Sequence, residues 1–247
     1  ALLKPEIYNQ EIKAQPNDTA LLRDAYALAA VQKDQVGMNQ LLDQIIALDR
    51  DDADPRTVGD AIWARRTKSQ LLVNSGSYKD FQEATRLLEQ NAGGEQQLQG
   101  TDLRLWLRYC ANRPEAASRQ RAVTRLTAIQ NRRRLADNEK VVLAGLYKTS
   151  GQWSDAQQMM VDLLTANPDN QTLMSTYIEW LLERDQPRDA AVWIRRLDPA
   201  STNAIRFQAI VEVQQGKERE AAKRLMATMP FQKRRRAHPL TRSMRAR

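Results

Sequence analysis

The sequence predicts an all-α protein built from about six antiparallel helix pairs. Composition is the first observation: among 247 residues only nine are glycine and nine are proline, while 42% are hydrophobic and 28% are charged. This is typical of a helical chain with enough apolar residues for a core. The second observation is a pattern of small and apolar residues that repeats every 34 positions. The third is the placement of turn residues between the predicted helices.

The repeat is clearest around Ala156. Steps of 34 residues lead from Ala156 to Ala122 and Ala190, and two larger apolar residues follow each alanine at the same spacings of four and three. These larger residues are Leu126 and Ile129, Met160 and Leu163, and Ile194 and Leu197. Because small residues let two helices approach closely and larger ones fill the groove, each set predicts one packed helix pair.

Turn residues divide the chain into units. Gly151 and Asp185–Pro187 separate the two helices of a pair, and Asn167–Asp169 ends one pair before the next begins. The predicted C-terminal units, within residues 101–230, are about 103–136, 137–170, 171–201 and 202–230. Residues 1–91 contain N-terminal helical repeats, of which the last is irregular, with longer helices that lose the 34-residue register. The glycine-containing segment 92–100 is predicted to be a flexible joint.

Unit 137–170 resembles the tetratricopeptide-repeat (TPR) superfamily. The residues at that family's spacings are Ala144, Tyr147, Gly151, Ala156, Met160, Leu163 and Pro168. Trp106, followed by Tyr109 and Cys110, is similar to the tryptophan–leucine–glycine start of the family motif, with two substitutions. The resemblance extends over three consecutive units and implies a right-handed α-α superhelix, a TPR solenoid.

The resemblance also implies a non-catalytic scaffold for protein–protein interaction. In TPR proteins the first helix of each pair lines a concave groove that holds a peptide or helix of a partner protein. The residues that the resemblance places in this groove are Asn138, Val141, Lys148, Thr172, Ser175, Glu179, Asn203 and Arg206. One subfamily binds acidic chaperone termini through lysines, asparagines and an arginine, but the matching positions here hold Val141, Gly145, Ser175 and Glu179. That role is therefore disfavoured.

Positive charge is concentrated at the C-terminus. The formal net charge is +8, and residues 231–247 hold seven basic residues and no acid, so the rest of the chain is nearly neutral. Lys233, Arg234, Arg235 and Arg236 are a candidate anion-binding cluster for nucleic acid or anionic lipid. A disordered terminus, or residues foreign to the native protein, explains this basic tail equally well.

The sequence offers no recognisable catalytic, metal or cofactor site, and we expect the protein not to be an enzyme. The single histidine, His238, lies in the basic tail, and the single cysteine, Cys110, is expected to be a small core residue. The aspartates of residues 49–54 lack the ligand alternation of a calcium loop, so we expect them to cap the helix that begins near Pro55. The basic run 132–134 is expected to interact with the carbonyl end of the preceding helix.

Two other functions stay open. One is a nucleic-acid adaptor that binds through the basic tail. The other is the periplasmic TPR part of a bacterial envelope assembly, such as a polysaccharide-export apparatus. The chain opens inside a helix pair, so we expect it to be part of a longer array. Its location is predicted to be either cytoplasmic or bacterial periplasmic, and its five tryptophans are expected to pack between helices.

Overall fold

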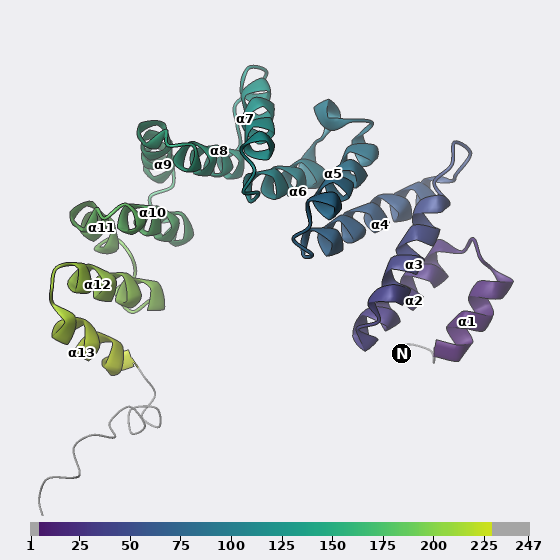
Figure 1. Ribbon diagram of the computed structural model, residues 1–247, viewed down its shortest axis with the longest axis horizontal. Coiled ribbons are helices and arrows are strands. Elements are labelled where there is room, and N and C mark those ends of the chain that lie inside the picture. Colours follow the sequence, from purple (N-terminus) through teal and green to yellow (C-terminus); the bar gives the residue numbers. More distant parts are fainter. Residues whose placement is uncertain (1–4, 229–247) are drawn as a thin grey trace, which may run out of the picture. The chain divides into compact units, whose positions relative to one another are not determined.

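The computed structural model describes residues 5–228. These residues form thirteen α-helices and one short 3-10 helix, and the described part of the chain contains no strand (Figure 1). The predicted all-α fold of successive antiparallel helix pairs is therefore confirmed. Contacts divide the chain into two compact units, and the boundary in the sequence falls between Gln152 and Trp153. No described helix has the length and the apolar character needed to cross a membrane.

Each helix packs mainly on its neighbours in the sequence. The helices of the first unit are α1 (Pro5–Ala14), α2 (Thr19–Gln32), α3 (Gln35–Ala47), α4 (Pro55–Val73), α5 (Tyr78–Ala92), the 3-10 helix η1 (Glu95–Gln97), α6 (Gly100–Ala111), α7 (Ala116–Gln130) and α8 (Asp137–Thr149). Those of the second unit are α9 (Trp153–Ala166), α10 (Gln171–Glu183), α11 (Pro187–Ile194), α12 (Thr202–Gln214) and α13 (Glu218–Thr228). Within each unit, consecutive α-helices contact each other, and so do α6 with α8 and α10 with α12. Such nearest-neighbour contacts are typical of a repeat array.

The alanines of the predicted repeat lie in the core. Ala122, Ala156 and Ala190 are all fully buried. The larger apolar residues that follow them are buried as well: Leu126, Ile129, Met160, Leu163, Ile194 and Leu197. The period in the sequence is thus a packing period, because each alanine marks a place where a neighbouring helix comes close.

Helix α4 shows how local sequence sets a helix start. Asp54 Oδ1 accepts hydrogen bonds from the backbone N–H groups of Arg56 (2.9 Å) and Thr57 (3.1 Å). The Thr57 hydroxyl donates to Asp54 Oδ2, and these bonds lower the pKa of Asp54. The expected cap is therefore confirmed for Asp54. It is wrong for Asp49, whose carboxylate instead forms an ion pair with Arg65 of α4.

The predicted joint 92–100 lies inside the first compact unit and contains η1. Leu98 of this segment is only 1% exposed. The Arg125 guanidinium of α7 donates from Nη2 to the carbonyl oxygen of Leu98 (3.0 Å) and from Nη1 to Gln96 Oε1 (3.2 Å). The segment is therefore attached to α7, while its flexibility and the predicted unit boundaries stay predictions.

Candidate functional site

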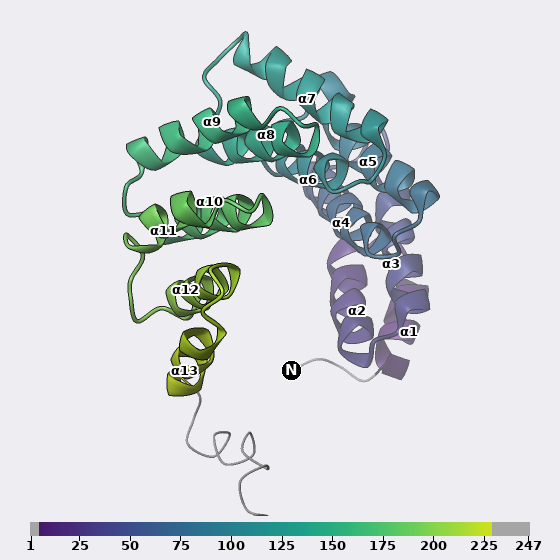
Figure 2. The same ribbon diagram turned by 60° about the vertical axis from the view of Figure 1, so that its left-hand side comes forward.

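Helices α10 and α12 bring predicted groove residues of the second unit together. The two helices contact each other and lie side by side in Figures 1 and 2. Arg206 of α12 forms an ion pair with Glu179 of α10, with 2.6 Å between Nη2 and Oε1. One turn away, the Asn203 side-chain amide donates to the Ser175 hydroxyl (3.3 Å). Two helices that are separate in the sequence thus present one continuous polar face.

The four residues of these two contacts differ in what they offer to a partner. The side chains of Glu179 and Arg206 are 47% and 50% exposed, so their ion pair contributes little to stability and is open to competition by a ligand. Ser175 is buried, and its hydroxyl holds the exposed Asn203 amide in place. Thr172, the remaining predicted residue on α10, is exposed. Ser175 therefore positions the surface rather than forming its outer part.

Two exposed apolar residues extend this polar face. Ile210 and Val213 are 38% and 51% exposed, and they follow Arg206 on α12 at spacings of four and seven residues. Residues at these spacings lie on one side of a helix. We call the set of Thr172, Glu179, Asn203, Arg206, Ile210 and Val213 the α10–α12 surface. Ile210 and Val213 are not among the predicted groove residues, although continuing the helical spacing from Arg206 would have added them.

The other predicted groove residues, Asn138, Val141 and Lys148, lie on α8 in the first unit. Asn138 is exposed, whereas Val141 and Lys148 are half-buried. Helix α8 packs on α6 and α7. Arg104 of α6 lies one 34-residue period before Asn138 and is exposed. The repeat register therefore could have added Arg104 to the predicted set.

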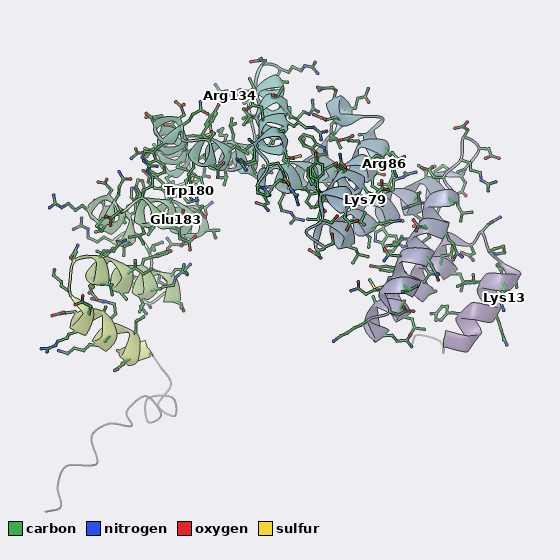
Figure 3. All side chains as sticks on the ribbon, viewed as in Figure 1. Lys13, Lys79, Arg86, Arg134, Trp180 and Glu183 are labelled. Carbon is green, nitrogen blue, oxygen red and sulfur yellow. The ribbon has the colours of Figure 1, made fainter. Side chains whose placement is uncertain are left out.

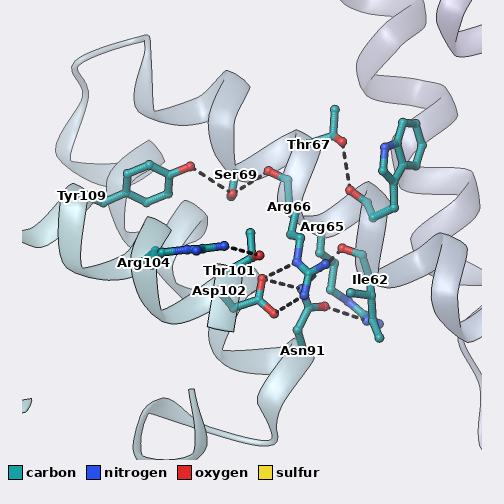
Figure 4. Close-up of polar contacts among 11 residues, drawn as sticks. Ile62, Arg65, Arg66, Thr67, Ser69, Asn91, Thr101, Asp102, Arg104 and Tyr109 are labelled. Atoms are coloured by element: carbon teal, nitrogen blue, oxygen red, sulfur yellow. Dashed lines mark hydrogen bonds and ion pairs between the residues drawn. The ribbon is translucent and has the colours of Figure 1, made fainter. Parts of the chain in front are cut away.

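Buried acids connect the first helices of successive pairs in the first unit. Asp60 of α4 pairs with Arg23 of α2 (2.5 Å), and Asp102 of α6 receives two hydrogen bonds from Arg66 of α4 (2.6 and 2.9 Å; Figure 4). Burial raises the pKa of Asp60, but the hydrogen bonds from Thr19 and Arg23 outweigh it and leave that pKa lowered. Both carboxylates therefore serve as structural partners of arginines from the preceding helix pair.

The Asp102 pair belongs to a larger polar network, shown in Figure 4. The side-chain amide of Asn91, on α5, donates to Asp102 Oδ1 and to the carbonyl oxygen of Ile62, both at 3.4 Å. Its oxygen accepts a hydrogen bond from Arg65 (3.3 Å). The network joins α4, α5 and α6 through hydrogen bonds among its own members, although the buried Nε of Arg65 has no hydrogen-bond partner.

Reactive groups are scarce in the described part of the chain. Cys110 is fully buried, as expected of a core residue, and burial raises its pKa to about 12, so the nucleophilic thiolate is suppressed at neutral pH. Within residues 5–228, no group of three or more His, Cys, Asp and Glu residues is arranged to hold a metal ion. His238 and the cluster Lys233–Arg236 lie outside the described residues.

In the basic run after α7, the Arg133 side chain also binds the start of the next helix. The Arg133 guanidinium donates to both carboxylate oxygens of Glu139 (2.8 and 2.7 Å). It also donates to the carbonyl oxygen of Arg134 (2.9 Å), a residue labelled in Figure 3. The backbone N–H groups of Arg132 and Arg133 both donate to the carbonyl oxygen of Ile129 (2.9 Å each), while the favourable charge interaction expected at this helix end stays a prediction. A buried carboxylate at the next helix start offers a stronger, charge-assisted pair of hydrogen bonds.

Three of the five tryptophans pack between helices, as expected. Trp63 meets Tyr26 edge-to-face, with 5.3 Å between ring centroids, and Trp193 meets Tyr177 in the same way at 5.4 Å. Trp106 is fully buried, and its indole N–H donates to Glu89 (2.9 Å). Each of these three rings contacts a neighbouring helix.

The successive antiparallel helix pairs give this chain the fold of a TPR protein. It is similar over 94% of its length to the crystal structure of a tetratricopeptide repeat protein from Parabacteroides merdae ATCC 43184, of which the match covers 88%. The TM-score is 0.60 and the sequence identity 12%, so the similarity concerns the fold alone. No family model and no curated protein sequence matches the chain.

Proposed function

We propose that the protein is a non-catalytic scaffold that binds a segment of a partner protein along the exposed faces of the first helices of its pairs. TPR-like folds generally mediate protein–protein interactions. The observation that carries the proposal is the α10–α12 surface, where a half-exposed ion pair lies next to exposed Ile210 and Val213. Surfaces that combine apolar anchors with polar groups suit an amphipathic or extended peptide.

Each part of the α10–α12 surface would have a separate role in binding. Ile210 and Val213 would supply the apolar area that a partner removes from water. Glu179 and Arg206 would select the partner's charge pattern and its orientation, since half-exposed charges affect specificity more than affinity. On α8, Asn138, Val141 and Lys148 would add further contacts of the same kind.

The test uses two valines of equal exposure. Val213 on α12 is 51% exposed and Val192 on α11, the second helix of its pair, is 50% exposed. Val213→Asp should reduce capture of the partner from a lysate of the native source about tenfold or more, because it puts a charge into the proposed apolar contact. Val192→Asp should leave capture unchanged. Equal capture by both variants, with matching circular dichroism spectra, would remove the α10–α12 surface from the proposal.

The alternative functions rest on the sequence alone. A nucleic-acid adaptor would depend on Lys233–Arg236, and removal of residues 231–247 should then abolish binding of an oligonucleotide. A periplasmic role in polysaccharide export would need an envelope partner among the captured proteins. Either result would favour the corresponding alternative function over the scaffold proposal.

A further inference from the structure

A cleft of about 680 Å³ opens between α4, α5 and α6 in the first unit. Its polar lining consists of three side-chain amides and two guanidinium groups: Gln70, Asn74, Asn112, Arg108 and Arg113. No lining residue is acidic. The cleft therefore carries positive charge together with groups that both donate and accept hydrogen bonds.

The two arginines of the cleft differ in availability. Arg113 donates to both carboxylate oxygens of Glu115 (2.7 and 2.5 Å) and to the carbonyl oxygen of Gly76 (3.1 Å), so it is part of the wall. Arg108 is exposed and, among residues 5–228, forms no ion pair. Its guanidinium carbon lies 5.6 Å from the centroid of the Tyr109 ring. Arg108 thus keeps its hydrogen-bond donors available for a ligand.

Below these polar groups the cleft has an apolar floor. Phe81 and Leu105 are 2% and 8% exposed, and the half-buried Val73 lies beside them in the lining. The Tyr109 hydroxyl is within hydrogen-bond distance of the Ser69 hydroxyl (3.3 Å), which holds the Tyr109 ring in place (Figure 4). The Arg113 guanidinium carbon lies 5.2 Å from the centroid of the Phe81 ring, so Val73 is the more accessible apolar residue of the lining. The cleft volume is in the range of ligand pockets.

We propose that this cleft binds an acidic, extended segment of a partner protein. A Glu or Asp carboxylate of the segment pairs with Arg108 at the rim, and the following apolar side chain packs on Val73 beside Leu105. The amides of Gln70, Asn74 and Asn112 bind backbone N–H and C=O groups of the segment. The inference rests on the proposed protein-binding function, but it uses helices other than those of the α10–α12 surface.

Helix electrostatics place the carboxylate at the rim. The carbonyl ends of α4 and α6 border the cleft at Asn74 and Asn112, and these partial negative charges oppose an anion deep inside it. Arg108 lies in the last turn of α6 but is exposed, so its side chain can pair with a carboxylate on the solvent side of the cleft. Nucleic acid fits less well, since it needs several cations along its backbone and open aromatic faces for its bases. One available arginine above an apolar floor suits a peptide.

The test measures fluorescence anisotropy of the full chain with a labelled, C-terminally amidated peptide, Gly-Ser-Glu-Glu-Leu-Phe-Gly-Ser. Arg108→Gln should weaken binding about tenfold or more, because it removes a charge-assisted pair. Arg188→Gln, a change of the same type at an exposed arginine of α11, should leave the affinity unchanged. Asn74→Trp, which fills the cleft without changing charge, should also abolish binding. Replacing both glutamates of the peptide by glutamine should have the effect of Arg108→Gln.

Four results would overturn the inference: no binding of the acidic peptide by the wild-type chain, equal affinity for Arg108→Gln, equal affinity for Asn74→Trp, or equal binding of the glutamine peptide. Arg108-dependent binding of a phosphoserine peptide or of a single-stranded oligonucleotide, with none of the acidic peptide, would overturn the assigned occupant. Circular dichroism spectra verify folding of every variant. The Val213→Asp capture experiment does not involve the cleft. The scaffold proposal can therefore hold even if the cleft does not bind the acidic peptide.

Discussion

Glu139, in the first turn of α8, combines burial with three hydrogen bonds. Its carboxylate accepts from Arg133 and from the backbone N–H of Ala136 (2.8 Å), and it is only 6% exposed. The bonds from Arg133, followed by that from Ala136, hold the pKa of Glu139 below its ordinary value against the opposing effect of burial. Because Arg133 is half exposed, solvent screens part of the interaction.

We expect Glu139→Gln to lower the free energy of unfolding at pH 7 by about 1–2 kcal/mol, since the amide loses the charge and one acceptor. A lowered folded-state pKa stabilises the protein above the unfolded value of 4.5, and that contribution is lost as the pH falls through the folded value. The difference between wild type and variant should therefore shrink below pH 4.5. Urea titrations at pH 7 and pH 3.5 measure it. Glu218→Gln, at the exposed start of α13, is the control and should change little at either pH.

Residue-scale prediction from sequence succeeds where packing follows the repeat. Ala122, Ala156 and Ala190 are recognisable because one periodic contact needs one small side chain. The ion pair of Arg66 with Asp102 is not recognisable, since its partners are 36 positions apart and meet only after two helices pack in one register. Arg108 is not recognisable for the same reason, because its availability for a ligand depends on the positions of all acidic side chains near it in the folded chain.

Two arginines of α7 bind the segment between α5 and α6: Arg121 pairs with Glu95, and the buried Arg125 binds Gln96 and Leu98. Arg125 is 5% exposed, and its Nε has no hydrogen-bond partner in the described structure, while Nη1 and Nη2 bind the segment. Burial lowers the pKa of Arg125, and the positive charge of Arg132 and Arg133 adds to the shift. Burial of the Arg125 charge is unfavourable, and the hydrogen bond to the carbonyl oxygen of Leu98 offsets part of that cost.

Arg125→Met keeps the side-chain length but removes both hydrogen bonds to the segment. Amide hydrogen exchange of residues 93–100 should then accelerate about tenfold or more, because the loss of a hydrogen bond to a charged donor costs about 1.5–3 kcal/mol. Mass spectrometry of peptides covering the segment measures this, and Arg104→Met on the exposed face of α6 is the control. Rapid exchange in the wild type would support the predicted flexible joint, whereas slow exchange in the wild type would contradict it.

Element-scale features differ in how far the sequence determines them. Of the longer helices expected before residue 92, α4 has 19 residues, whereas α5 has 15 and equals α7 in length. Glycines mark the following turn, since Gly93 and Gly94 have φ of +76° and +132°. The burial of Leu98 has no local signal, because it depends on Arg125, which lies 27 residues further along the chain.

At the scale of the molecule, nearest-neighbour packing should confine the effects of a core mutation. Each helix draws its contacts mainly from helices next to it in the chain, within two compact units. In such an array, stability is roughly a sum of repeat terms and interface terms. A cavity in one unit should therefore destabilise its own helices first, instead of the whole chain at once.

Two phenylalanines make this expectation testable. Phe207 of α12, in the second unit, is 1% exposed, and Phe81 of α5, in the first unit, is 2% exposed. Replacement of either by alanine should cost about 3–5 kcal/mol locally, through lost burial and the cavity left behind. Hydrogen exchange should then accelerate in α12 and α13 for Phe207→Ala, and in α4 and α5 for Phe81→Ala. Acceleration of all helices by both variants would mean that the array unfolds as one cooperative body, and the nearest-neighbour description would be wrong.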